Sequence, residues 1–220
     1  MKKSTRTVKF PQIREELLAL EKIDQETAKS APAILSKIKN KSRFLNQSKN
    51  IYSQFHVRAN RMLEILDIIK LPSIENIGAD GCGALLLLAQ HSYIGCMQKV
   101  LSAIEESLVA DPDSFPVENI PSLIDRIMVI KKRKQKFGTQ WSISENGKME
   151  TAYLIPVEDF KNMNKRRKKY GLGPAMKVTD LAYGAEKYPL GKGRAEESNQ
   201  REMTNNEHRI YSRYFHKSLV

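Results

Sequence analysis

The chain has 220 residues, of which 40% are hydrophobic, and its 37 lysines and arginines outnumber its 25 aspartates and glutamates to give a net charge of +12. This length is enough for one domain with a sizeable core plus extensions. The longest purely apolar run, Ala84–Ala89, is too short to span a bilayer. Met1–Phe10 is basic, but the apolar segment of a secretory signal does not follow it. We therefore expect a cytoplasmic protein, or an effector secreted without a Sec signal.

The charge is unevenly distributed along the chain. Residues 1–70 contain 15 basic and 7 acidic residues, residues 71–130 contain 2 and 8, and residues 131–177 contain 13 and 4. An acidic and apolar centre is thus flanked by basic segments. This distribution suits nucleic acid, an acidic protein or an anionic small molecule as a partner, and it selects none of them.

Apolar residues at helical spacing dominate the first 130 residues. They predict a first helix over Pro11–Ala28, with Leu17 on its inner side. A long second helix should end before Pro72, because a residue that precedes proline is pushed out of the helical region. A further helix is expected to begin near Ile120–Pro121, since proline is well suited to a first helical turn.

The stretch Gly78–Leu108 is the most apolar part of the chain, and its apolar residues recur in steps that predict one continuous helix. His91 lies on the apolar face of this helix, with Gln90 beside it. A buried imidazole or amide without a partner costs about 1–3 kcal/mol, so both should have partners. Cys82 and Cys96 would be about 21 Å apart on such a helix, too far to bridge. We expect them to be small hydrophobic residues in a reducing compartment.

Asp125 and Arg126 interrupt the apolar run of the helix that begins near Ile120. Charged groups inside such a run are seldom left unpaired, because their desolvation is costly. Two interpretations stay open. The two residues either fix the packing of the helix, or contact His91 or a ligand.

From Phe137 on, apolar and polar residues alternate, where the preceding apolar residues have helical spacing. Asn146-Gly147, which follows, is a strong signal for a two-residue turn. We therefore expect a β-hairpin at about residues 137–155, with Trp141 on its apolar face and Gln140 on the other. A last helix is expected over Pro156–Tyr170. Its basic end, Lys165–Lys169, suits the helix dipole, and contact with an anion or RNA is the second interpretation.

These elements together predict a mainly α fold. Residues 1–177 should form a single compact helical domain with one β-hairpin, and residues 178–220 a polar, partly disordered tail.

The order of the polar features carries a resemblance. Gln90-His91 is followed by Asp125-Arg126, by QKFGTQ at Gln135–Gln140, by PVED at Pro156–Asp159 and by RRKKYGLGP at Arg166–Pro174. This order resembles a bacterial family described as a domain of unknown function, over roughly residues 50–175. The family pairs a QH with a DR and a Q-x-aromatic-GTQ, and often has an acidic residue shortly after the histidine, where Ser92 and Tyr93 stand here. The resemblance implies a shared polar site and lends no activity.

Two functions of different classes are compatible with these features. The first is a hydrolase or transferase acting on an anionic small molecule, with His91 as general base or ligand-binding group and Asp125 orienting it. The substrate would be held by charged and amide side chains: Gln90, Arg126, Gln135, Gln140 and Arg166. We expect no cofactor and no metal, because the sequence contains no dinucleotide fingerprint and no metal-ligand spacing.

The alternative is a basic binding module. Its flanking segments would bind RNA or a host or partner protein, and the QH, DR and GTQ residues would only hold the fold. A secreted effector would suit this case.

The Asn146-Gly147 turn leads to a first testable prediction. Replacing both residues by alanine should lower the melting temperature and change the fluorescence environment of Trp141, because the turn sets the register of the two strands. Thermal unfolding followed by fluorescence of this single tryptophan measures both effects. An unchanged melting temperature would count against the hairpin.

Overall fold

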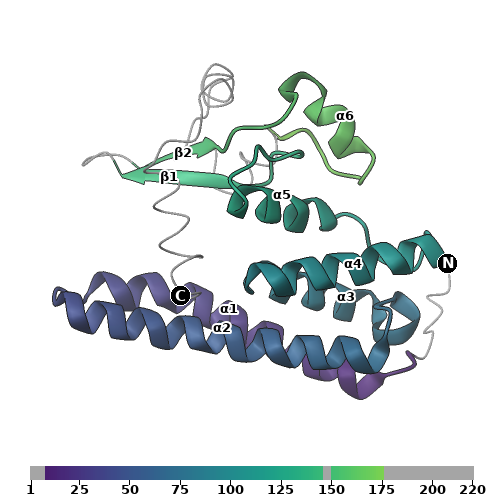
Figure 1. Ribbon diagram of the computed structural model, residues 1–220, viewed down its shortest axis with the longest axis horizontal. Helices are drawn as coiled ribbons and strands as arrows, with labels where there is room; N and C mark the ends of the chain where they lie inside the picture. The colour runs from purple at the N-terminus through teal and green to yellow at the C-terminus, as the bar shows by residue number, and fades with distance from the viewer. Residues whose placement is uncertain (1–7, 146–149, 176–220) are drawn as a thin grey trace. The chain divides into compact units, whose positions relative to one another are not determined.

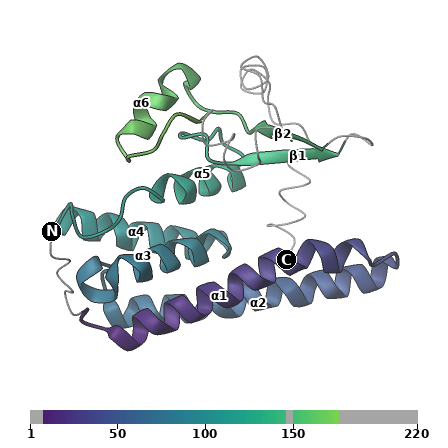
Figure 2. The same ribbon diagram turned by 180° about the vertical axis from the view of Figure 1, so that it is seen from behind.

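The computed structural model describes residues 8–145 and 150–175, so the predicted tail over residues 178–220 lies outside the described part (Figures 1 and 2). The chain divides into two compact units, residues 1–116 and residues 117–220, where the sequence predicts a single domain over residues 1–177. The division follows Pro112 and Pro116, in a segment without helix or strand between the fourth and fifth helices.

The first unit consists of four helices: α1 (Pro11–Ser36), α2 (Lys41–Ile69), α3 (Ile74–Gln90) and α4 (Ile94–Ala110). Side chains cap two of them, since Asn40 accepts a hydrogen bond from the amide of Arg43 and Ser73 accepts one from Asn76. Figures 1 and 2 show α1 and α2 alongside one another, with α3 and α4 packed beside them. The interior of this unit is formed by fully buried apolar side chains: Leu17, Met62, Ile65, Ile77, Leu85, Met97 and Ile104.

The predicted second helix is confirmed, but α1 continues to Ser36, beyond the predicted end at Ala28. The helix passes through Pro32, which lacks the N–H for one backbone hydrogen bond, and the proline ring fixes φ near the value that a helix needs. None of the described helices combines the length and the apolar character needed to cross a membrane.

The predicted continuous helix over Gly78–Leu108 is wrong, because the chain breaks between α3 and α4. His91 caps the end of α3 with φ −97° and ψ 2°, and Tyr93 begins α4 in extended conformation. Between them, the hydroxyl of Ser92 donates to the carbonyl of Ala89 at 2.6 Å and closes the turn. The apolar residues before and after the break therefore belong to two helices in contact, and His91 lies at a corner.

Both cysteines are free and buried, as expected, although Cys82 lies on α3 and Cys96 on α4. Burial raises the pKa of Cys82 to about 12 and that of Cys96 to about 11. Both thiols are therefore protonated at neutral pH and behave as small apolar side chains.

The second unit begins with α5 (Ile120–Ile130), as predicted. Its last named elements are η1 (Phe160–Asn162) and α6 (Met163–Lys168). Between them, β1 (Trp141–Glu145) pairs antiparallel with β2 (Glu150–Leu154), with Trp141 opposite Leu154. Trp141 packs against the buried cluster of Leu154, Val157, Met163 and Ala175. The mainly helical fold is confirmed, while the Asn146-Gly147 turn lies outside the described residues and stays a prediction.

Two boundaries in this unit differ from the predicted ones. Residues 137–140 form a loop, and the strand starts only at Trp141. Residues 156–159 do not start a helix, because Gln135 donates its backbone amide to the carbonyl of Pro156 and accepts from the amide of Glu158. The helical part begins after Asp159, which has a positive φ of 45°.

Gly138 is the glycine that this loop requires. It has a φ of +67°, and an added Cβ would lie 2.5 Å from the sulfur of the buried Met163. Gly138→Ala should therefore lower the free energy of unfolding of the second unit by about 1–3 kcal/mol. Denaturant unfolding followed by Trp141 fluorescence measures this change.

Gly173→Ala is the matched control in the same unit, because an added Cβ there meets nothing within 4 Å. It should change stability by less than about 0.5 kcal/mol. Equal effects of the two substitutions would contradict the strain assigned to Gly138.

Candidate functional site

Asp125 is the centre of the polar set in the second unit. Its side chain is fully buried on α5, and its two carboxylate oxygens accept hydrogen bonds from the loop that follows the helix. The donors are the amides of Lys136 at 2.7 Å, Phe137 at 3.0 Å and Thr139 at 3.0 Å, and the Thr139 hydroxyl at 2.9 Å. Burial raises the pKa of Asp125, while these hydrogen bonds act in the opposite direction.

Gln135 and Gln140 hold the two ends of the same loop together. Gln135 is fully buried, and its Nε2 donates to the carbonyls of Gln140 at 2.9 Å and Ile155 at 2.6 Å. Its Oε1 accepts from the amide of Gln140 at 2.9 Å. The side chain of Gln140 donates in turn to the carbonyl of Ser122 on α5 at 3.3 Å. These amide groups therefore bind main-chain atoms of their own unit.

The two arginines of α6 also bind main-chain carbonyls of their own unit. Arg166 donates to the carbonyls of Lys136, Glu158 and Asp159 and pairs with the Asp159 carboxylate. Arg167, which the sequence analysis did not single out, is 1% exposed and donates to the carbonyls of Gly173 and Phe137. Burial lowers the pKa of Arg167, and the nearby charge of Asp125 raises it.

The structure thus brings together Asp125, Gln135 and Gln140, and Arg166 of α6 bonds the same loop through the carbonyl of Lys136. Arg126 follows Asp125 on α5 and is half-buried. Because most polar atoms of this set contact main chain, the arrangement holds the loop over residues 131–140 in place.

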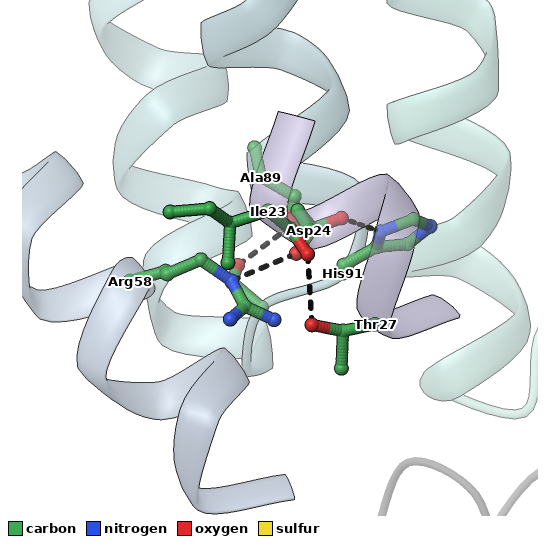
Figure 3. Close-up of polar contacts among 7 residues, drawn as sticks. Ile23, Asp24, Thr27, Arg58, Ala89 and His91 are labelled. Carbon is green, nitrogen blue, oxygen red and sulfur yellow. Dashed lines mark hydrogen bonds and ion pairs between the residues drawn. The ribbon is translucent and has the colours of Figure 1, made fainter. Parts of the chain in front are cut away.

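His91 belongs to the other unit, where it contacts a carboxylate from a different helix. Figure 3 shows Asp24 of α1 between His91, at the end of α3, and Arg58 of α2. The Nδ1 of His91 hydrogen-bonds the Oδ2 of Asp24, and the Nε of Arg58 donates to the Oδ1 of Asp24 at 3.1 Å. Asp24 is 1% exposed and Arg58 is 6% exposed, whereas 26% of the His91 side chain reaches solvent.

The remaining neighbours of His91 are aromatic and polar. Phe55 contacts the imidazole edge to face at 5.9 Å, and the Arg58 guanidinium lies 4.7 Å above the Phe55 ring. Arg58 Nη2 is buried and has no hydrogen-bond partner among the described residues. Two residues after His91, the Tyr93 ring stacks on His56 at 5.3 Å and its hydroxyl donates to Asn60.

Sequence reasoning missed Asp24 and Arg58, although Asp24 carried a usable signal. It lies seven residues after Leu17 and four after Leu20, so it continues the apolar stripe of α1 as a charged residue. Gln90 is half-buried beside His91, as the last residue of α3. Asp24 hydrogen-bonds Nδ1 of His91, and the sequence analysis had named Asp125 as the residue that orients this ring. The predicted convergence of His91 with the Asp125 set stays a prediction.

The geometry defines what His91 can do chemically. An imidazole that donates Nδ1–H to a buried carboxylate has its lone pair on Nε2, as in the histidines of general-base sites. Among the described residues, no group of three histidine, cysteine or carboxylate side chains is arranged to hold a metal ion.

Comparisons with protein-family models, with curated proteins and with solved structures give no match for this chain. The resemblance based on the QH, DR and GTQ residues therefore stays a prediction.

The hydrogen bonds to Asp125 lead to a stability prediction. In Asp125→Asn, one oxygen becomes an NH2 group that faces backbone donors, so the second unit should lose about 3 kcal/mol or more of stability. Denaturant unfolding followed by Trp141 fluorescence measures the loss. The exposed Glu118 supplies the control, because Glu118→Gln removes the same charge and should change stability by less than about 0.5 kcal/mol. Similar midpoints for the two variants would contradict a structural role of Asp125.

Proposed function

We propose that His91, oriented by Asp24, is the general base of a hydrolase or transferase that acts on an anionic small molecule. The observation that carries this proposal is the pairing of a half-exposed imidazole with a carboxylate that is 1% exposed. A buried carboxylate fixes the tautomer and the orientation of the ring and stabilises the imidazolium that forms when Nε2 takes a proton.

Arg58 supplies positive charge at this site. Its guanidinium bonds Asp24 through Nε alone, and its Nη2 is without a hydrogen-bond partner among the described residues. The charge of this guanidinium favours a carboxylate or phosphate ligand beside Asp24. This supports an anionic substrate. The sequence analysis also proposed Arg166 to hold the anionic substrate, but this side chain already binds three carbonyls and the Asp159 carboxylate.

A purely structural role is the competing explanation, since Asp24 also ties α1 to α2 and α3. His91→Asn separates the two roles. The asparagine amide nitrogen takes the place of Nδ1 and keeps a donor for Asp24, whereas Nε2 is removed. The variant should keep the helical circular dichroism of the wild type and lose the base.

The assay is the hydrolysis of p-nitrophenyl phosphate and bis(p-nitrophenyl) phosphate. His91→Asn should lower kcat by about 10²–10⁴-fold, which is the usual contribution of a general base. Asp67→Asn, at an exposed position of α2, is the control and should leave kcat unchanged. Equal rates for the wild type and His91→Asn, or no turnover of either ester by the wild type, would contradict the proposal.

A further inference from the structure

Two basic segments that lie far apart in the sequence are held side by side in the second unit. Arg166 of α6 donates its Nε to the carbonyl of Lys136 at 2.9 Å, and Arg167 donates Nη1 to the carbonyl of Phe137 at 2.8 Å. These bonds join α6 to the loop after α5. The exposed cations of the two segments form what we call the basic face: Lys131, Lys132, Arg133, Lys134, Lys136, Lys165, Lys168 and Lys169.

The fold accounts for only part of this charge. Lys131 and Lys132 lie at the C-terminal end of α5, where the helix dipole favours cations, but this effect falls off within a turn and does not reach Lys134 or Lys136. Helix α6 has six residues, which makes its dipole small. None of the eight side chains of the basic face forms an ion pair with a described residue, and the neighbouring Asp159 is already paired with Arg166. Cations gathered without counter-charges repel one another, so an external anion would stabilise them.

The surroundings of the basic face discriminate between kinds of polyanion. Tyr170 packs its ring against the buried Phe137 at 5.1 Å, and Phe160 packs against the buried cluster that also contacts Trp141. These rings are half-buried against the interior, so they offer little surface for the stacking with bases on which binding of single-stranded nucleic acid depends. The large apolar side chains that are exposed in the described chain all lie in the first unit, so the basic face has no apolar anchor for a membrane.

We infer that the basic face binds the phosphate backbone of double-stranded nucleic acid without reading its sequence. Phosphates spaced regularly along a duplex suit cations held on a fixed scaffold, and contacts with phosphate alone carry no sequence information. The buried contacts of Asp125, Gln135 and Arg167 supply this scaffold, since they fix both basic segments relative to each other. The inference is independent of the function proposed for His91.

The test is the binding of the full chain to labelled DNA and RNA duplexes of about 20 base pairs, followed by fluorescence anisotropy from about 50 to 200 mM salt. Lys134→Gln and Lys168→Gln each remove one cation, from the loop and from α6. Each should flatten the slope of log affinity against log salt by about 0.9, and the double variant by about 1.8. The control is the double variant Lys49→Gln, Lys99→Gln, which removes the same charge from exposed positions of α2 and α4 and should leave the slope unchanged.

Duplexes of two unrelated sequences should bind equally, and His91→Asn should bind like the wild type. An equal flattening by the control variant would overturn the inference, because net charge alone would then explain binding. Tighter binding of single-stranded RNA, of polyglutamate or of phosphatidylserine vesicles would also overturn it in favour of that partner.

Discussion

Asp24 places a carboxylate with 1% of its surface exposed among three helices, and the arrangement of the first unit around His91 depends on how that charge is satisfied. Burying an isolated carboxylate costs several kcal/mol, and removing one partner of a buried pair costs about 3–5 kcal/mol. Arg58 from α2 and His91 from the end of α3 meet this demand from two sides. The break between α3 and α4 therefore places the His91 imidazole against the Asp24 carboxylate.

The two buried aspartates of this chain obey the same physics with different results. Asp125 accepts all its hydrogen bonds from main-chain amides and the Thr139 hydroxyl of one loop, so the donors cannot leave without unfolding that loop. Asp24 instead bonds two ionisable side chains, and one of these, His91, reaches solvent. A carboxylate satisfied by main chain stabilises a fold, whereas one bonded to a partly exposed imidazole also fixes the orientation of that ring.

The sequence predicts local features better than tertiary ones. Helix α2 and helix α5 follow from apolar spacing and from proline at their ends, because both signals are local. The break at His91 could not be found in this way, since the apolar steps continue across it and the closing contact is a single hydroxyl of Ser92. The loop over residues 137–140 was mistaken for a strand, because the amide of Phe137 bonds the Asp125 carboxylate and Gly138 packs against Met163, so neither residue pairs in a sheet.

The candidate sites were also predicted only as far as local patterns allow. His91 and Asp125 stood out in the sequence because each interrupts an apolar pattern, but a pattern does not reveal which partner satisfies a polar group. The partner of His91 lies 67 residues earlier on α1, and the partners of Asp125 lie 11 to 14 residues later. Arg167 was hidden in a run of six polar residues whose other cations are largely exposed, although it alone is fully buried.

The distribution of unused polar atoms then indicates where each unit can bind something. In the second unit the interior amides and the α6 arginines are largely committed to carbonyls, so its available chemistry is the charge on its surface. In the first unit the available chemistry lies beside the interior, where a half-exposed imidazole adjoins a guanidinium with an unused donor. A small anion suits the site beside His91 in the first unit, because few groups converge there at short range. A long polyanion suits the basic face of the second unit, because many weak, screened contacts add up only along an extended ligand.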